Sequence, residues 1–257
     1  MANEYTGRGD LARSMQLLWG VERPGERGPR RTLTVEEITS AAIALADVEG
    51  LGGVSMRPLA QCLGIGTMSL YRYLPGRAEL IDLMVDRVCG ETQPADRVRG
   101  GWRRRVEHVA WENLRLYERH PWLLEVFPGQ PPLGPGIIGK YEQELRSLDG
   151  IGLGDVEMDL ALTLVVEYAR AAAGTIIGTA QMHEQLRRSD AEWWEAIAPT
   201  LAQVVDEEQY PLSTRVGMAA TERYGGISDP VLAFEFGLER VLDGIEALVR
   251  RRSGEGA

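Results

Sequence analysis

The sequence predicts an all-α protein built from a small N-terminal domain and a larger C-terminal helical domain. Apolar residues recur at helical spacing along most of the 257 residues, and no segment of any length alternates between apolar and polar residues as a strand does. A polar stretch with a proline and paired glycines, residues 91–101, is the best candidate boundary. We therefore expect an arm at residues 1–33, a first domain at 34–90 and a second domain at 91–257.

The N-terminal arm is expected to be flexible and basic. Residues 11–20 read LARSMQLLWG, which is compatible with a short helix, whereas residues 21–31 combine prolines and glycines with four arginines. A disordered tail and a functional segment are equally compatible with this composition.

Helix signals are clear in the first domain. Thr34 followed by Glu37 forms a capping box, with Leu33 and Ile38 as its hydrophobic staple, and the helix that they begin ends at Gly50. Three more helices are expected at residues 56–63, 67–73 and 77–90.

The second domain reads as a set of longer helices. They are expected at residues 102–119, 140–148, 155–187, 190–208 and 229–251, with a proline- and glycine-rich segment at 121–139. The small side chains of AAAGTIIG (171–178) permit another helix to approach closely, and the last helix carries an apolar stripe from Val231 to Leu248.

The net charge of −10 is unevenly distributed. Residues 1–90 hold 10 arginines against 11 acidic residues, and residues 91–257 hold 18 basic against 27 acidic residues. The second domain would therefore be repelled by a polyanion, while arginines of the first part make contact with it. Charge is compatible with nucleic-acid binding but does not argue for it.

Cysteine and histidine usage argues against a metal centre. Cys62 and Cys89 lie inside helical patterns, the three histidines are scattered, and no Ser-His-Asp or Cys-His arrangement emerges. We expect that the protein binds no metal or cofactor and is not an enzyme. The N-terminus lacks a signal-peptide apolar stretch, and no apolar run nears the roughly 18 residues that cross a bilayer. A cytoplasmic protein without membrane contact is therefore expected.

The segment from Met56 to Leu74 carries the main functional signal. Two short helices joined by a tight turn pack nearly perpendicular, which requires a small residue where they cross, here Ala60. The turn requires a residue that takes the left-handed conformation, here Gly64. Because Leu70 fits between the two helices, the spacing predicts a helix-turn-helix.

The outward face of the second short helix suits DNA. If Leu70 and Leu74 point inward, hydroxyls, a guanidinium and an aromatic ring are left outward, which suits phosphates and base edges. Tyr73 belongs either to the core or to a phosphate contact. The outward residues are Thr67, Met68, Ser69, Tyr71 and Arg72.

Residues 34–88 resemble the DNA-binding domain of the tetracycline-repressor (TetR) family. The resemblance rests on a capped first helix ending in EGL, on VSMRPLAQCLG and on SLYRYLPGRAELIDLM. It implies that Tyr71 and Arg77 clamp phosphates, with Arg77 standing where the family usually has lysine, and that Arg57 reaches a base or the backbone. The expected DNA contacts are Ser55, Arg57, Thr67, Met68, Ser69, Tyr71, Arg72, Tyr73 and Arg77, with Arg30 and Arg31 of the arm in a minor groove.

The second domain resembles, more loosely, the ligand-binding domain of the same family, through RHPWL (119–123), PPLGP (131–135) and FEFGLERVLDGIEALV (234–249). The resemblance implies a homodimer formed by helices 155–187 and 229–251. No histidine lies between residues 121 and 182, where the family's metal-binding histidine would stand, so tetracycline is not expected as ligand. A pocket for a small apolar or aromatic effector is expected at Trp111, Leu114, Tyr117, Trp122, Phe127, Tyr141, Leu164, Tyr168 and Ile176.

The sequence thus predicts an N-terminal three-helix helix-turn-helix DNA-binding domain and a C-terminal helical ligand-binding and dimerisation domain. The expected function is a homodimeric repressor that leaves a palindromic operator in double-stranded DNA when a small molecule binds. Two alternatives remain: a helical small-molecule-binding protein or enzyme with an incidental helix-turn-helix, and a ligandless architectural DNA binder. Turnover of a bound compound would favour the first, and the absence of any bound compound would favour the second.

Overall fold

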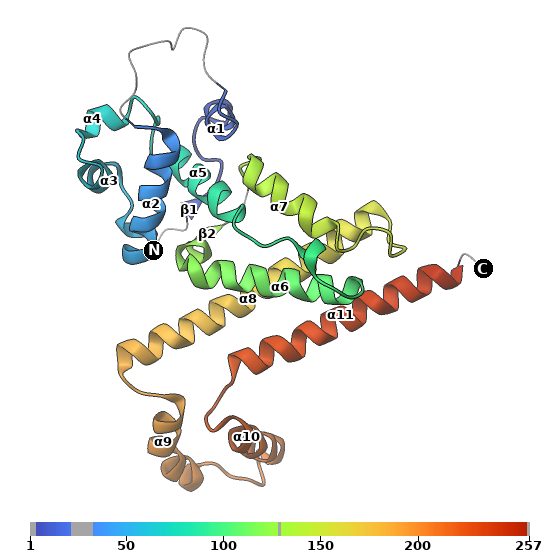
Figure 1. Ribbon diagram of the computed structural model, residues 1–257. Helices are drawn as coiled ribbons and strands as arrows, with labels where there is room; N and C mark the ends of the chain where they lie inside the picture. Colours follow the sequence, from blue (N-terminus) through green and yellow to red (C-terminus); the bar gives the residue numbers. More distant parts are fainter. Residues whose placement is uncertain (1–3, 22–32, 128–129, 256–257) are drawn as a thin grey trace.

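The computed structural model describes residues 4–21, 33–127 and 130–255. A small domain of helices α2 to α5 lies at one end of the molecule (Figure 1). Helices α6, α7, α8 and α11 form the body, and α9 and α10 project from the far ends of α8 and α11. The described residues are almost entirely helical, apart from one pair of two-residue strands, which confirms the all-α fold class.

The small domain begins with the expected capping box. The hydroxyl of Thr34 accepts from the backbone N–H of Glu37, and the Glu37 carboxylate accepts from the backbone N–H of Thr34. The four helices are α2 (Val35–Glu49), α3 (Met56–Cys62), α4 (Thr67–Leu70) and α5 (Arg77–Cys89), with a 3-10 turn, η1 (Leu51–Gly53), between α2 and α3. Helix α4 ends three residues before the expected position, because residues 71–73 continue as a turn.

The body is held together by α8. It packs most extensively against α6 and next against α11. These helices are α6 (Trp102–Arg119), α8 (Asp155–Leu186) and α11 (Pro230–Glu255), and buried side chains recur at three- and four-residue intervals along each of them. The shorter α7 (Pro135–Leu145) packs against α5 and α8 and starts five residues earlier than expected, with Pro135 in its first turn, where proline is tolerated.

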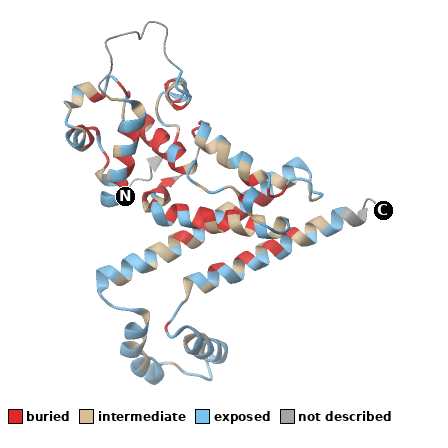
Figure 2. Ribbon diagram, in the orientation of Figure 1, coloured by how far each residue is buried: buried red, intermediate tan, exposed pale blue. Residues whose placement is uncertain are grey.

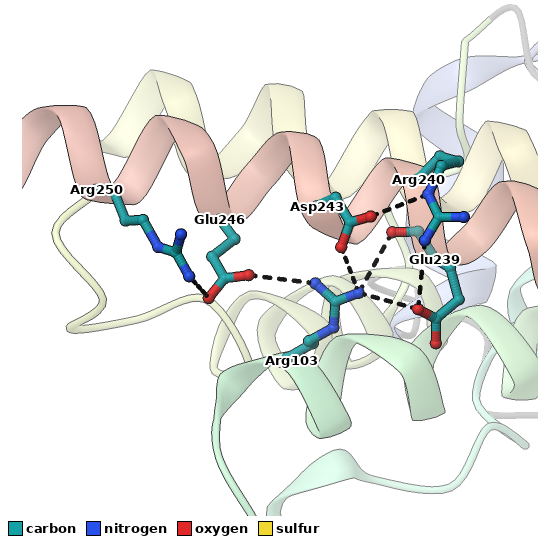
Figure 3. A network of polar contacts seen from close by, with 6 residues as sticks. All are labelled: Arg103, Glu239, Arg240, Asp243, Glu246 and Arg250. Carbon is teal, nitrogen blue, oxygen red and sulfur yellow. Dashed lines mark hydrogen bonds and ion pairs between the residues drawn. The ribbon is translucent and has the colours of Figure 1, made fainter.

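Polar contacts fix α11 against α6. The Arg103 guanidinium of α6 contacts the carboxylates of Asp243 at 2.7 Å, Glu239 at 3.3 Å and Glu246 at 3.5 Å on α11 (Figure 3). Arg240 shares Asp243 at 2.9 Å. Such half-exposed ion pairs stabilise a protein modestly, but a guanidinium shared among three carboxylates sets the register of the two helices.

The projecting pair is α9 (Asp190–Val204) and α10 (Pro211–Tyr224). Neither helix has a buried residue, and both are almost wholly exposed or half-exposed in Figure 2. Helix α10 is absent from the sequence-based expectation, and α9 ends at residue 204 rather than 208. Both helices differ in this from α6 and α8, each of which has several buried residues.

Residues 4–21, here called the strap, differ from the flexible arm expected over residues 1–33. Strand β1 (Glu4–Tyr5) pairs in parallel with β2 (Val126–Phe127), and helix α1 (Leu11–Leu18) packs on α5. The strap therefore joins the small domain to the body. The expected short helix at 11–20 is confirmed, whereas the arginine-rich residues 22–32 lie outside the described part of the chain.

Two further short turns are η2 (Ala95–Arg97), in the connection between the domains, and η3 (Pro121–Glu125), directly after α6. One helix, α8, is long and apolar enough by length and composition to cross a membrane. That observation is weak evidence, because the core helices of other proteins pass the same test.

Candidate functional site

The α3–α4 unit has the geometry of a helix-turn-helix. Gly64 adopts φ +66° in the turn, and the backbone N–H of Ile65 donates to the Ala60 carbonyl at 3.0 Å, which closes the turn over the end of α3. Leu59, Ala60 and Leu70 are all buried to within 1% of complete burial. The small Ala60 side chain lets α4 cross close to α3, as the sequence predicts.

Most residues expected to contact DNA are accessible at the surface of this unit. Met68 is 78% exposed and Tyr71 is 46% exposed, and Ser55, Arg57 and Arg72 are also exposed. Thr67 and Ser69 are half-buried. The accessible hydroxyl, guanidinium and apolar groups on this surface are of the kinds that contact phosphates and base edges.

Four of the expected contacts stand differently. Tyr73 is only 8% exposed and packs in the core of the small domain. Arg30 and Arg31 lie outside the described residues. Ser55 stands at the N-cap position of α3, but its hydroxyl makes no capping hydrogen bond to that helix.

Arg77 is bound to the backbone of its own domain. Its Nε donates to the Val54 carbonyl at 2.7 Å and its Nη2 donates to the Leu51 carbonyl at 2.9 Å. These carbonyls lie at the first residue of η1 and at the residue directly after η1, in the segment that leads into α3. The side chain therefore braces the turn against the start of α5, a role that the family resemblance did not imply.

A cavity of about 270 Å³ lies between the small domain and the body. Its walls come from α5, α6, α7, α8, Thr6 of the strap, and four residues between α6 and α7, which are Leu123, Val126, Pro131 and Pro132. The volume is slightly below the range of about 300–1,000 Å³ that is usual for small-molecule sites. The lining residues are Thr6, Val85, Cys89, Asn113, Leu116, Tyr117, Leu123, Val126, Pro131, Pro132, Ile137, Lys140, Tyr141, Glu144, Leu162, Thr163, Val166, Glu167 and Arg170.

Of the nine residues expected to line a pocket, Tyr117 and Tyr141 line this cavity. Trp111 and Tyr168 instead pack on Phe234, with ring centroids 4.9 and 5.7 Å from it, and stiffen the contact of α6 and α8 with α11. Trp122 is buried and donates from Nε1 to Asp47 at 2.8 Å. Leu114 belongs to the core, Ile176 packs against it, Leu164 is exposed on α8, and the Phe127 side chain lies outside the described part.

Polar residues of the cavity are the ones that sequence reasoning missed. The Glu144 carboxylate accepts from Lys140 Nζ at 2.7 Å and from Asn113 Nδ2 at 2.6 Å. Arg170 donates from Nη2 to the carbonyls of Leu124 and Val126 and lies over the Tyr117 ring. The only available signal was that Lys140 is the single lysine of the chain.

Burial changes the acid–base properties of two cavity residues. It raises the pKa of the Cys89 thiol to about 11, and it raises the pKa of Tyr117 against the opposing effect of Arg170. Both groups are therefore neutral at physiological pH and are suited to neutral hydrogen bonds and apolar contact. Among the described residues, no group of three His, Cys, Asp or Glu side chains is placed to hold a metal ion.

Helix α5 of the small domain is joined to the cavity wall through α7. The Asp86 carboxylate accepts from the backbone N–H groups of Gly136 at 3.1 Å and Ile137 at 2.9 Å, at the first turn of α7. A Cβ on Gly136 would collide with the Asp86 carbonyl, so this close approach requires glycine. Since α7 contributes Ile137 and Lys140 to the cavity, a shift of α7 reaches α5 directly.

A second joint links α2 to the body. Asp47 of α2 contacts Nδ1 of the buried His120 at 2.7 Å and accepts from the Trp122 indole, and the other ring nitrogen of His120 faces Glu91 at 3.0 Å. Both ring nitrogens of His120 therefore lie beside carboxylate oxygens. This joint fixes the small domain against η3.

Comparisons with known proteins agree with this arrangement. A family model of the tetracyclin repressor-like C-terminal domain matches residues 93–249. The HTH-type transcriptional repressor DrrR1 of Streptomyces coeruleorubidus is 42% identical over 257 residues, which cover all of this chain and 93% of the relative. The HTH-type transcriptional repressor Rv1353c of Mycobacterium tuberculosis is 25% identical over 237 residues, covering 90% of this chain and 87% of the relative.

Solved structures resemble the chain over most of its length. The TetR family protein ActR of Streptomyces coelicolor, in complex with actinorhodin, superposes with a TM-score of 0.70 at 26% identity, over 85% of this chain and 97% of that one. ActR without ligand gives a TM-score of 0.66 over 89% of this chain and all of that one. The chain therefore belongs to the tetracycline-repressor family of helix-turn-helix transcriptional regulators.

Proposed function

We propose that the protein is a homodimeric repressor that binds a palindromic operator through α3 and α4 and leaves it when a small molecule enters the cavity. The observation that carries the proposal is the position of the cavity. It is lined by Val85 and Cys89 of α5, the last helix of the DNA-binding domain. A molecule in the cavity therefore touches the element that orients the helix-turn-helix.

The DNA contacts are assigned to the exposed side chains of α3 and α4. Tyr71 and Arg72 offer a hydroxyl and a guanidinium to phosphates and base edges, and Thr67 and Ser69 flank the exposed Met68. Arg57 at the start of α3 completes this surface. Arg77 is assigned a positioning role, because its Nε and Nη2 bind backbone carbonyls.

A second copy of the chain is the proposed partner of α8 and α11. Leu160 and Leu164 on α8 are 61% and 52% exposed, and Phe236 on α11 is 64% exposed. Leu160 and Leu164 line a groove of about 370 Å³ between the two helices. Two helices from each subunit would bury this apolar surface in a four-helix bundle, and the two-fold axis would present both helix-turn-helix units to a palindromic site.

The proposed effector is a planar aromatic molecule that carries hydroxyl or carbonyl groups. Apolar side chains such as Val85, Leu116 and Leu162 and two tyrosine rings favour a flat apolar body. Asn113 and Lys140 place polar groups beside it. The complex of ActR with actinorhodin supports this class, since ActR resembles this chain in fold.

Release from DNA follows from linkage between the two sites. A ligand that binds better to one arrangement of α7 shifts α5 through Asp86, and coupling of roughly 1–3 kcal/mol changes DNA affinity by a factor of about 5–150. By reciprocity, operator DNA weakens effector binding by the same factor.

The test is fluorescence anisotropy on duplexes that tile the DNA upstream of the protein's own gene, at near-physiological salt and with scrambled competitor. We expect a specific complex of two protomers with a Kd of about 10⁻⁸ M or tighter. Tyr71→Ala should abolish specificity, whereas Val48→Ala, at an 84% exposed position on α2, should leave it unchanged. Binding equal to the competitor at every site would contradict the proposal.

A further inference from the structure

The strap is anchored on α5 by two buried carboxylates. Asp82 accepts from the backbone N–H of Gly7 at 3.0 Å and from the Ser14 hydroxyl at 2.9 Å. Glu79 accepts from the backbone N–H of Asp10 at 2.9 Å. Both carboxylates are at most 5% exposed, so the strap covers them from solvent.

The two ends of the strap reach the wall of the cavity. Near its start, β1 pairs with β2, which contributes Val126 to the lining. At its end, the Trp19 indole donates to the Leu133 carbonyl at 3.0 Å, directly after Pro131 and Pro132 of the lining. The strap therefore lies across one side of the cavity, beside the α5 residues that line it.

Thr6 brings an unsatisfied polar atom to this cavity. It lines the cavity, its residue is 5% exposed, and its hydroxyl oxygen is buried without a hydrogen-bond partner among the described residues. A buried hydroxyl without a partner has lost its hydrogen bonds to water, so native proteins rarely retain one without a reason. A molecule in the cavity with a hydroxyl or carbonyl group would supply the missing partner.

We propose that the strap is a wall of the effector site and that the Thr6 hydroxyl forms a hydrogen bond with the bound effector. The inference rests on the proposed function, because it assigns a residue and a segment to the effector cavity described above. It makes effector recognition depend on a segment that precedes the DNA-binding domain in the chain. The strap then contacts the ligand at Thr6 and α5 at Asp82, seven positions before the cavity-lining Cys89.

The first experiment tests the wall without any ligand. In the full-length chain, Ser14→Ala combined with Leu18→Ala removes one anchor and one buried side chain of α1, and faster amide hydrogen exchange at residues 11–18 verifies that the strap has loosened. Alkylation of Cys89, which lines the cavity, should then accelerate several-fold. Cys62, exposed on α3, is the internal control, and Met15→Ala, on the exposed side of α1, is the matched variant.

The second experiment tests the hydroxyl. The probe is danthron, a planar dihydroxyanthraquinone, and its affinity is measured by isothermal titration calorimetry. Thr6→Val keeps the shape and removes the hydroxyl, so the Kd should rise by about 3- to 10-fold, the effect of one neutral hydrogen bond. Thr6→Ser keeps the hydroxyl and should bind within about twofold of the wild type, within the scatter of a conserved hydrogen bond.

The outcomes separate the two proposals. If the variant with Ser14→Ala and Leu18→Ala has a loosened α1 but Cys89 is alkylated at the wild-type rate, the strap is not a wall of the cavity and the inference is wrong. If Thr6→Val binds danthron as the wild type does, the hydroxyl does not contact the ligand and that half of the inference is wrong. If the wild type binds no danthron while Cys89 responds to the loosened strap, the effector class of the proposed function fails and the assignment of the wall is supported.

Discussion

Arg77 gives the sharpest test of how the DNA-binding domain is built. Arg77→Ala removes two hydrogen bonds from a guanidinium to carbonyls 26 and 23 residues earlier in the chain. Hydrogen bonds to a charged group contribute about 1.5–3 kcal/mol each, and the half-buried position puts both at the low end, so a loss of about 3 kcal/mol is expected. For a chain of this size that corresponds to a fall in Tm of roughly 6–12 °C.

The assay compares three variants by urea denaturation and by operator binding. Arg77→Lys keeps the charge but replaces a fork of donors by a single ammonium, so it should recover only part of the stability. Arg87→Ala is the control on the same helix, since its ion pair with Glu36 is exposed and contributes at most about 1 kcal/mol. A variant Arg77→Ala with unchanged stability and weaker, less salt-dependent DNA binding would refute the bracing role and restore the phosphate clamp that the family resemblance implies.

Three further predictions concern the joints of α5 and η3. Gly136→Ala should lower the free energy of unfolding by about 1–3 kcal/mol, because the added Cβ collides with Asp86. Gly139→Ala is the control on the same helix: its Cβ meets open space, so it should stabilise the helix by about 0.5–1 kcal/mol. Equal urea midpoints for the two variants would contradict the close approach of α7 to α5. Burial raises the folded-state pKa of Asp86 above its ordinary value of 3.8, so the folded protein binds the proton more tightly than the unfolded chain. As pH falls from the raised folded-state pKa towards 3.8, the wild type should therefore gain stability relative to Asp86→Asn. A stability difference between the two proteins that does not change with pH would contradict the shift. Trp122→Phe removes the indole hydrogen bond to the α2 carboxylate and should cost about 1 kcal/mol in urea denaturation, while an unchanged midpoint would show that this joint contributes nothing.

Local sequence determined most of the helices and the helix-turn-helix, whereas α10 was not predicted. Capping, helical periodicity and the left-handed turn at Gly64 depend on residues within about five positions of one another, and each is read directly from the chain. The same reasoning placed α6 at its observed residues and α8 and α11 close to theirs. The sequence also predicted the exposed face of α4, because the burial of Leu70 and Leu74 fixes which of the neighbouring residues face outward.

Tertiary structure alone decided which side chains meet. An apolar or aromatic residue at a helical position signals burial without saying what covers it, so Trp111 and Tyr168 were assigned to a pocket although they pack on Phe234. Arg77 and Thr6 show the same limit for polar residues. The partners of Arg77 lie in a turn more than 20 positions away, and Thr6 reaches a cavity whose other walls are formed by four helices.

The structure of the strap differs most from the sequence-based expectation, for the same reason. Its glycines and charges read locally as a flexible arm, yet its backbone is ordered by carboxylates of α5 about 70 residues later in the chain. Periodicity and capping report contacts between near neighbours in sequence. Contacts over such separations depend on how whole helices are placed in space, and only the folded chain specifies them.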